Sequence, residues 1–193
     1  MKWFFTSMAI LSMMHVSAQD KPYYYQIPEA PANFTAATVA ARLVDGLGFR
    51  YFWATEGLTE KDLAFKPSDS ARTSLQTIEH IYGLTSILLN SVSEKPTVFG
   101  QPAEKLSFSQ LRERTLKNIQ TASEILKKQD SQLGDFDMIF ERGDQKQVYP
   151  FWNLVNGPIS DALWHVGQVV TFRRSSGNPL PKGVNVLAGT KTD

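Results

Sequence analysis

The most constraining feature of this sequence is a stretch, residues 73–92, that is apolar on almost every side when it folds as a helix. Ile78 and Leu89 belong to one apolar face, while Leu84 belongs to a second face that His80 shares. A helix that is apolar nearly all round is stable only when other elements cover it. The stretch therefore predicts a helix in the interior of a bundle, with His80 turned away from solvent.

Three further stretches carry apolar residues at intervals of three and four, which is the period of an amphipathic helix. They are residues 35–58, 108–128 and 151–175. Ser107 and Gln110 form a capping-box pattern before the second of these, and Ser70 or Thr73 can cap the interior helix. Gly157-Pro158 interrupts the last helix, either as a kink or as a new start. The sequence thus predicts an all-α domain built as a four-helix bundle.

The connections between these helices carry two further predictions. Residues 136–140 and 145–149 have the composition of two short strands, so we expect a β-hairpin between the third and fourth helices. The span of residues 130–149 also leaves room for a crossover connection. Prolines over residues 19–31 predict an extended arm on the body, and Gly46 and Gly48 in the first helix indicate close approach of a neighbour.

Residues 1–18 have the pattern of an export signal: Lys2, an apolar run over residues 3–14, and Val16-Ser17-Ala18 as a cleavage site. A membrane anchor is the alternative. However, the apolar run is shorter than the ~20 residues that span a bilayer, and the chain has no cysteine for lipid attachment. We therefore expect an exported protein, periplasmic or secreted, in which residues 19–193 form a single helical domain without a membrane span.

Charge and composition exclude two kinds of function. The chain has 20 lysines and arginines against 19 acidic residues, a formal charge of +1, and removal of Lys2 with the signal makes it neutral. Nothing in this balance attracts nucleic acid, so we expect no nucleic-acid partner. Because cysteine is absent, no thiolate can serve as a nucleophile or as a soft metal ligand.

The densest chemistry lies at the start of the last predicted helix, where Asp161 and His165 stand one turn apart on one face. His15 leaves with the signal, so His80 is the remaining imidazole that can join them. Burying two imidazoles and a carboxylate together is costly unless they satisfy one another or a cation. His80, Asp161 and His165 are therefore candidate metal ligands, and such an N,N,O set leaves coordination positions open. The alternative is that each side chain has an ordinary structural hydrogen bond.

His80 within Ile78-Glu79-His80-Ile81, and the pattern Asp161-x-x-x-His165-x-Gly167-Gln168, resemble the metal-site motifs of the DinB/YfiT-like superfamily. The resemblance implies a four-helix bundle of a less common topology, a mirror variant of up-and-down, with a divalent metal held by three histidines. It also implies metal-dependent hydrolase or thiol-dependent transferase activity, and the capacity to form a homodimer. Asp161 departs from the family by standing where the first histidine of the pair is usual. A carboxylate hardens the site, which is consistent with zinc, nickel, iron or manganese.

Other residues near these motifs have weaker claims to the site. Gln168 can fix a ligand or hold water from outside the ligand set, or it can be an ordinary buried amide. Trp164 is expected to pack, while Asn153 and Asn156, with Trp152, can line the mouth of a pocket; Asn156 is also a natural turn former. Arg173 and Arg174 can receive an anionic substrate, but cations in a last helical turn are the better interpretation.

The expectation for function is an exported metal-dependent hydrolase, in which a divalent ion held by His80, Asp161 and His165 acts on a small-molecule substrate. A thiol-dependent transferase is one alternative. A non-catalytic exported bundle, with a structural or lost metal site and an envelope partner, is another. No residue marks itself as a separate general base, so the sequence assigns no catalytic residue beyond the ligands.

Overall fold

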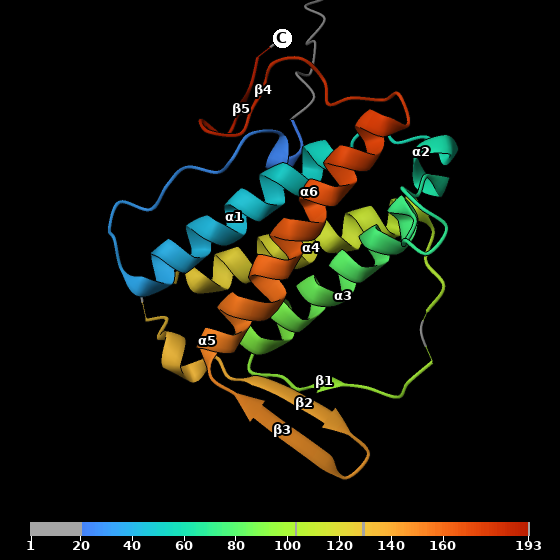
Figure 1. Ribbon diagram of the computed structural model, residues 1–193. Helices are drawn as coiled ribbons and strands as arrows, with labels where there is room; N and C mark the ends of the chain where they lie inside the picture. Colours follow the sequence, from blue (N-terminus) through green and yellow to red (C-terminus); the bar gives the residue numbers. More distant parts are fainter. Residues whose placement is uncertain (1–20, 103, 129, 193) are drawn as a thin grey trace, which may run out of the picture.

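The computed structural model describes residues 21–102, 104–128 and 130–192, so the expected signal, residues 1–18, lies outside the described part. The fold is mostly helical, with small sheets at its two ends (Figure 1). Four long helices make up the body: α1 (Ala36–Thr55), α3 (Ser74–Val92), α4 (Phe108–Leu126) and α6 (Ser160–Ser175). They correspond in order to the four helices that the sequence predicts.

Shorter elements connect the long helices or lie on them. They are η1 (Tyr23–Tyr25), α2 (Glu60–Ala64), β1 (Thr97–Val98), η2 (Leu133–Asp135), β2 (Met138–Arg142), β3 (Gln145–Tyr149), α5 (Phe151–Leu154), the π turn η3 (Val155–Ile159), β4 (Val184–Asn185) and β5 (Thr190–Lys191). In the described part of the chain, no helix has both the length and the apolar character that crossing a membrane requires.

Three of the long helices begin at capping boxes, which explains where they start. Thr35 caps α1, Thr73 caps α3 and Ser107 caps α4; each cap accepts a hydrogen bond from the backbone N–H three residues later. The side chain at that third position accepts in return from the backbone N–H of the cap, so two otherwise unpaired donors are satisfied. The expected box of Ser107 and Gln110 is confirmed, and Thr73 rather than Ser70 caps α3.

The four long helices surround one core, in which α1 contacts α4 and α6, and α3 contacts the same two helices. Arg112 near the start of α4 bonds Thr55 at the end of α1, so these helices are antiparallel. Arg173 near the end of α6 bonds the carbonyl of Trp53 near the end of α1, so these helices are parallel. Figure 1 shows α3 and α4 running together in the direction opposite to α1 and α6.

The crossover connection lies between α3 and α4, not between the third and fourth long helices as the sequence suggested. Because α3 and α4 are parallel neighbours, residues 93–107 must return along the whole body, past β1 (Figure 1). α4 has 19 residues, and at ~1.5 Å per residue this is roughly 28 Å. The connection from α4 to α5 stays at one end of the bundle and contains the hairpin.

The predicted hairpin is confirmed, with one strand shifted. β2 pairs with β3 in antiparallel register from Met138 opposite Tyr149 to Arg142 opposite Gln145, and Gly143 in the turn has a φ of 56°. The first strand begins two residues later than expected, at Met138. The sequence missed β1, which pairs in parallel with β2, because two residues are too short to show a strand period.

The N-terminal arm docks on α1 where the sequence predicted a close neighbour. The ring of Tyr24 covers Gly48, and a Cβ at Gly48 would lie 2.4 Å from that ring. The Tyr24 hydroxyl donates to Oδ1 of the buried Asp45 at 3.3 Å, and Nζ of Lys127 lies 2.6 Å from Oδ2. Burial, and then the negative charge of Asp45, raise the pKa of Tyr24, so the phenol keeps its proton and donates.

α3 is one wall of the bundle rather than a fully enclosed helix. Ile78, Ile81 and Leu88 are buried in the core, as their spacing predicts. Glu79 and Gly83 on the same helix are exposed. His80 lies between these two sides and is partly buried, so one edge of its ring faces solvent.

Candidate metal centre

His80, Asp161 and His165 come together in the space between α3 and α6. Each offers one ligand atom, and these atoms all lie within 4.8 Å of one another. Oδ2 of Asp161 is 3.2 Å from Nε2 of His80, and Oδ1 is 3.3 Å from Nε2 of His165. The two imidazole rings meet edge to face, with their centroids 4.6 Å apart. The three residues that the sequence singled out therefore form one cluster.

A π turn sets the face that α6 presents to α3. The sequence left open whether Pro158 kinks the last helix or starts a new one; the helix continues from α5 through η3 into α6, with Pro158 inside the π turn. Pro158 has no N–H to donate within this turn. The hydroxyl of Ser160 donates to the carbonyl of Val155 at 2.7 Å. A π turn holds one residue more than an α turn. The extra residue changes the direction around the helix axis in which Asp161 and His165 project.

The amide of Gln168 favours one tautomer of His165. Its Oε1 lies 2.8 Å from Nδ1 of His165, and an amide oxygen can only accept, so Nδ1 is the donor. In the neutral ring, Nε2 then has a lone pair directed at Oδ1 of Asp161. Two acceptors at 3.3 Å repel each other unless a proton or a cation lies between them. Gln168 is thus a partner of a candidate ligand, which is one of the two roles the sequence allowed.

The cluster is deep on one side and open on the other. The His165 side chain is 13% exposed, whereas the His80 and Asp161 side chains are 34% and 37% exposed. A small molecule can therefore approach the carboxylate and the His80 ring from solvent. Such partial exposure is typical of a site that exchanges water or substrate, in contrast to a closed structural site.

The residues expected around the site have mixed outcomes. Trp164 is 72% exposed and does not pack in the core, so the expectation of a packing role is wrong. Asn153, Asn156 and Trp152 are exposed on α5 and the π turn. Among the described residues, no side-chain hydrogen bond joins either asparagine to the three candidate ligands. The apolar character of Trp164 suggested burial, but its position on α6 lies outside the buried stripe of that helix.

Arg173 is structural rather than a receptor for an anion. It is buried, and its Nη1 donates to the carbonyls of Trp53, Ala54 and Glu56 at the end of α1. Burial lowers the pKa of Arg173, while Asp62 and Glu56 act in the opposite direction. Both Arg173 and Arg174 lie in the last turn of α6, as predicted, and Arg174 is exposed.

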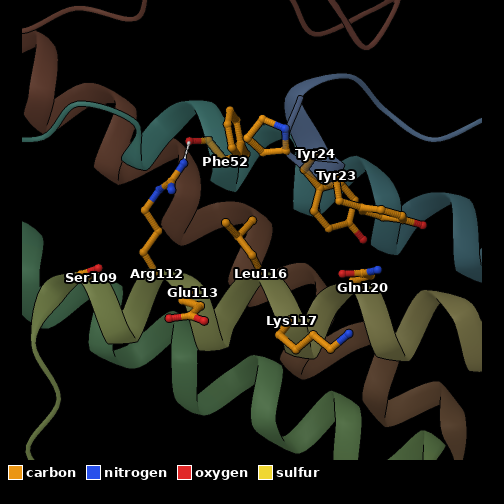
Figure 2. A pocket seen from close by; sticks show the side chains of 10 residues that line it. Tyr23, Tyr24, Phe52, Ser109, Arg112, Glu113, Leu116, Lys117 and Gln120 are labelled. Atoms are coloured by element: carbon orange, nitrogen blue, oxygen red, sulfur yellow. Dashed lines mark hydrogen bonds between the residues drawn. The ribbon is translucent and has the colours of Figure 1, made fainter. Parts of the chain in front are cut away.

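A pocket of about 370 Å³ lies away from this cluster, between the N-terminal arm, α1 and α4. Figure 2 shows Tyr23, Tyr24 and Phe52 facing a row of α4 side chains across it. The guanidinium of Arg112 stacks 4.7 Å from the Phe52 ring centroid and pairs with Glu56. Arg112 thereby ties the start of α4 to the end of α1.

Comparison of the chain with models of protein families, with curated proteins and with solved structures finds no match.

Proposed function

We propose that this protein is a metal-dependent enzyme, most simply a hydrolase, in which His80, Asp161 and His165 hold one divalent cation. The observation that carries the proposal is the convergence of three ligand atoms from two helices, with Nε2 of His165 facing a carboxylate oxygen. The resemblance to the DinB/YfiT-like superfamily supports the same assignment, because the motif residues lie on the second and last of the long helices.

The three residues fit a cation in spacing and in donor type. Two ligand atoms that are each ~2.1 Å from an ion at a tetrahedral angle lie roughly 3.4 Å apart. A different Asp161 oxygen faces each ring: Oδ2 lies 3.2 Å from Nε2 of His80, and Oδ1 lies 3.3 Å from Nε2 of His165. The ligand atoms of all three residues lie within 4.8 Å of one another. Two imidazoles and one carboxylate suit zinc, nickel, iron or manganese.

A divalent cation held by these three residues would supply Lewis acidity, which could polarise a substrate carbonyl or acidify water. Asp161 contributes negative charge that offsets the charge of the cation. Gln168 holds the His165 ring in the orientation and tautomer that a ligand needs. His80 and Asp161 are partly exposed, so a small substrate can approach the site from their side.

Metal titration of purified protein tests the proposal. After treatment with chelator, the native chain should take up one zinc, nickel, manganese or iron(II) ion by calorimetry, and the ion should raise the unfolding midpoint by mass action. Asp161→Asn keeps the shape of the side chain but removes its charge, so occupancy should fall sharply. Asp161→His, which restores a three-histidine set, should retain binding. Asp69→Asn changes an exposed acid on the connector before α3 and serves as the control.

The proposal fails if the native chain takes up none of these ions, or if Asp161→Asn binds as the native chain does. Loaded protein should then be assayed for ester and amide hydrolysis with and without added thiol. Hydrolysis that needs no thiol supports the hydrolase, whereas group transfer to the thiol supports a transferase.

A non-catalytic role is the second candidate, because Asp161 already bridges both imidazoles by direct contacts. In that case His80→Gln and Asp161→Asn should lower the midpoint of thermal unfolding in chelator by similar amounts. Under the metal proposal, removing one of three facing groups should change the chelator-treated protein little and the loaded protein strongly.

We also propose that the protein is exported, because residues 1–18 carry the signal pattern. Intact-mass measurement of the protein from the periplasm or medium should show a chain that begins at Gln19. A chain that keeps Met1 would contradict this assignment.

A further inference from the structure

A second hollow, of about 440 Å³, lies between α6, α1 and the C-terminal tail, and Val184 of β4 lines it. Its walls are mostly apolar and come from three parts of the chain: Trp53, Leu163, Val166, Val170, Leu180 and Val184. We name it the tail groove. Apolar hollows of this size are the usual sites of small organic ligands, which fill roughly 300–1,000 Å³.

The tail groove is separate from the metal centre although α6 contributes to both. Leu163, Gly167 and Val170 follow one another at intervals of four and three residues, so they form one stripe along α6. Asp161, His165 and Gln168 form another stripe, about half a turn away around the helix. A ligand in the tail groove therefore lies on the opposite face of α6 from the candidate metal ligands.

The charge of the tail groove has one sign. Arg50 and Arg174 line it, and no acidic residue is among the described residues that do. Arg50 donates to the carbonyl of Gly46 and lies 3.5 Å from that of Val186. The Arg174 side chain is exposed, and no hydrogen bond or ion pair joins it to another side chain in the described ranges.

We propose that the tail groove binds a single-chain carboxylic acid, with the acyl chain against the apolar walls and the carboxylate at Arg174 and Arg50. An apolar floor with guanidinium groups at its edge complements this class of amphiphile, because a carboxylate accepts two parallel hydrogen bonds from arginine. The volume suits one acyl chain of medium length; a phospholipid with two chains is larger. This site is independent of the proposed metal function.

Gly167 offers a way to fill the tail groove without disturbing the fold. It lies inside α6, it is exposed, and a Cβ there would meet nothing within 4 Å. Gly167→Leu therefore places a side chain in the hollow while improving helix propensity. Gly83→Leu is the matched control, because Gly83 is likewise exposed inside α3, has open space around it and does not line the hollow.

Calorimetric titration of the full chain with sodium decanoate, below its micelle concentration, tests the proposal. One decanoate should bind per chain, and octanoate should bind roughly tenfold to twentyfold more weakly, because each buried methylene is worth about fourfold in affinity. Gly167→Leu should abolish binding and Gly83→Leu should keep it. Arg174→Gln should weaken decanoate about threefold, as loss of a partly exposed ion pair does, while the exposed Arg72→Gln should not.

Equal binding of decanoate and decyltrimethylammonium would overturn the proposal, since the cations of the tail groove would then play no part. Unchanged decanoate binding in Gly167→Leu would place the ligand elsewhere and would also overturn it. Co-sedimentation with anionic phosphatidylglycerol vesicles, together with no heat from decanoate, would assign this surface to a bilayer and not to a free carboxylic acid.

Discussion

Arg173 is a buried cation that satisfies the end of a helix to which it does not belong. The last carbonyls of an α-helix have no partner within the helix, and those of Trp53, Ala54 and Glu56 accept from Arg173. Its Nε donates in addition to the carbonyl of Asn178 at 2.7 Å. One side chain thus joins the end of α1 to the end of α6, which keeps these two parallel helices in register.

Arg173→Met should lower the free energy of unfolding by about 3 kcal/mol, because several buried carbonyls lose their donor. Arg174→Met is the matched control on the next residue, and it should change stability by less than about 0.5 kcal/mol since Arg174 is exposed. Urea unfolding followed by circular dichroism measures both. Equal effects of the two substitutions would contradict the role given to Arg173.

Gln168 should influence metal affinity although it is not a ligand in the proposed site. Gln168→Leu removes the acceptor that holds Nδ1 of His165, and loss of such a partner typically weakens metal binding about 10-fold to 100-fold. Calorimetric zinc titration measures the change. Thr171→Val, on the next turn of α6, should leave affinity unchanged, because the Thr171 hydroxyl donates to the carbonyl of Gly167 and, in the described part of the chain, to no candidate ligand. Native-like affinity in Gln168→Leu would show that the amide does not orient the ring.

At the scale of elements, two helical glycines have different surroundings: one contacts the N-terminal arm and the other faces open space. The Tyr24 ring occupies the space that a Cβ at position 48 would need, whereas a Cβ at Gly83 would meet open space. The arm and α1 are therefore joined at a point where any side chain other than hydrogen would displace the arm.

Gly48→Ala should release the arm and destabilise the protein by about 1–3 kcal/mol, as overpacking does. Gly83→Ala should stabilise it by up to about 1 kcal/mol, because alanine is the better helix former. Thermal unfolding measures both changes, and limited chymotrypsin digestion at Tyr23–Tyr25 reports release of the arm. An unchanged digestion rate in Gly48→Ala would mean that the arm docks without Tyr24.

The long helices could be predicted because the apolar period and the capping boxes are local signals. Their directions could not, since periodicity shows which face of a helix is buried but not which neighbour it meets. The sequence therefore leaves room for a crossover in residues 130–149, whereas the crossover lies in the connection between α3 and α4. The π turn was missed for a similar reason: Gly157-Pro158 signals an irregularity, but not its geometry.

At the scale of the whole molecule, a cluster around Asp62 holds one end of the bundle together. The buried Asp62 carboxylate accepts hydrogen bonds from Ser176 and Asn178 after α6, and from Thr59 before α2. Burial alone would raise the pKa of Asp62, but these hydrogen bonds together lower it well below its ordinary value. The carboxylate form therefore stabilises the folded state.

This lowered pKa predicts how stability depends on acidity. The contribution of Asp62 is present above the pKa of an unfolded aspartate, ~3.9, and is lost as the pH falls below it towards the folded value. Asp62→Asn should be destabilised at pH 7 by about 1–3 kcal/mol, since an amide cannot accept all these bonds. Urea unfolding at pH 7 and pH 3 should show a smaller difference between the two proteins at pH 3. A difference that grows in acid would reverse the sign of this linkage.

The cluster of candidate ligands could be predicted because the sequence contains few histidines. Outside residues 1–18 the sequence has two histidines, so few combinations could place imidazoles together. The surroundings were less predictable: Trp164 is exposed and Arg173 is buried, the opposite of what residue type suggests. Arg173 is buried by its contacts with the end of α1, which lies more than a hundred residues earlier in the chain.

The separation of His80 from Asp161, 81 residues along the chain, has a consequence for folding. Bringing them together closes a loop whose entropic penalty grows with the logarithm of its length. The parallel pairing of α3 with α4 adds a further long-range contact, because the connection between these helices must span the length of the bundle. Docking of α3 on α6 brings the two imidazoles together, so binding of an ion by all three residues would stabilise this docked arrangement of distant segments.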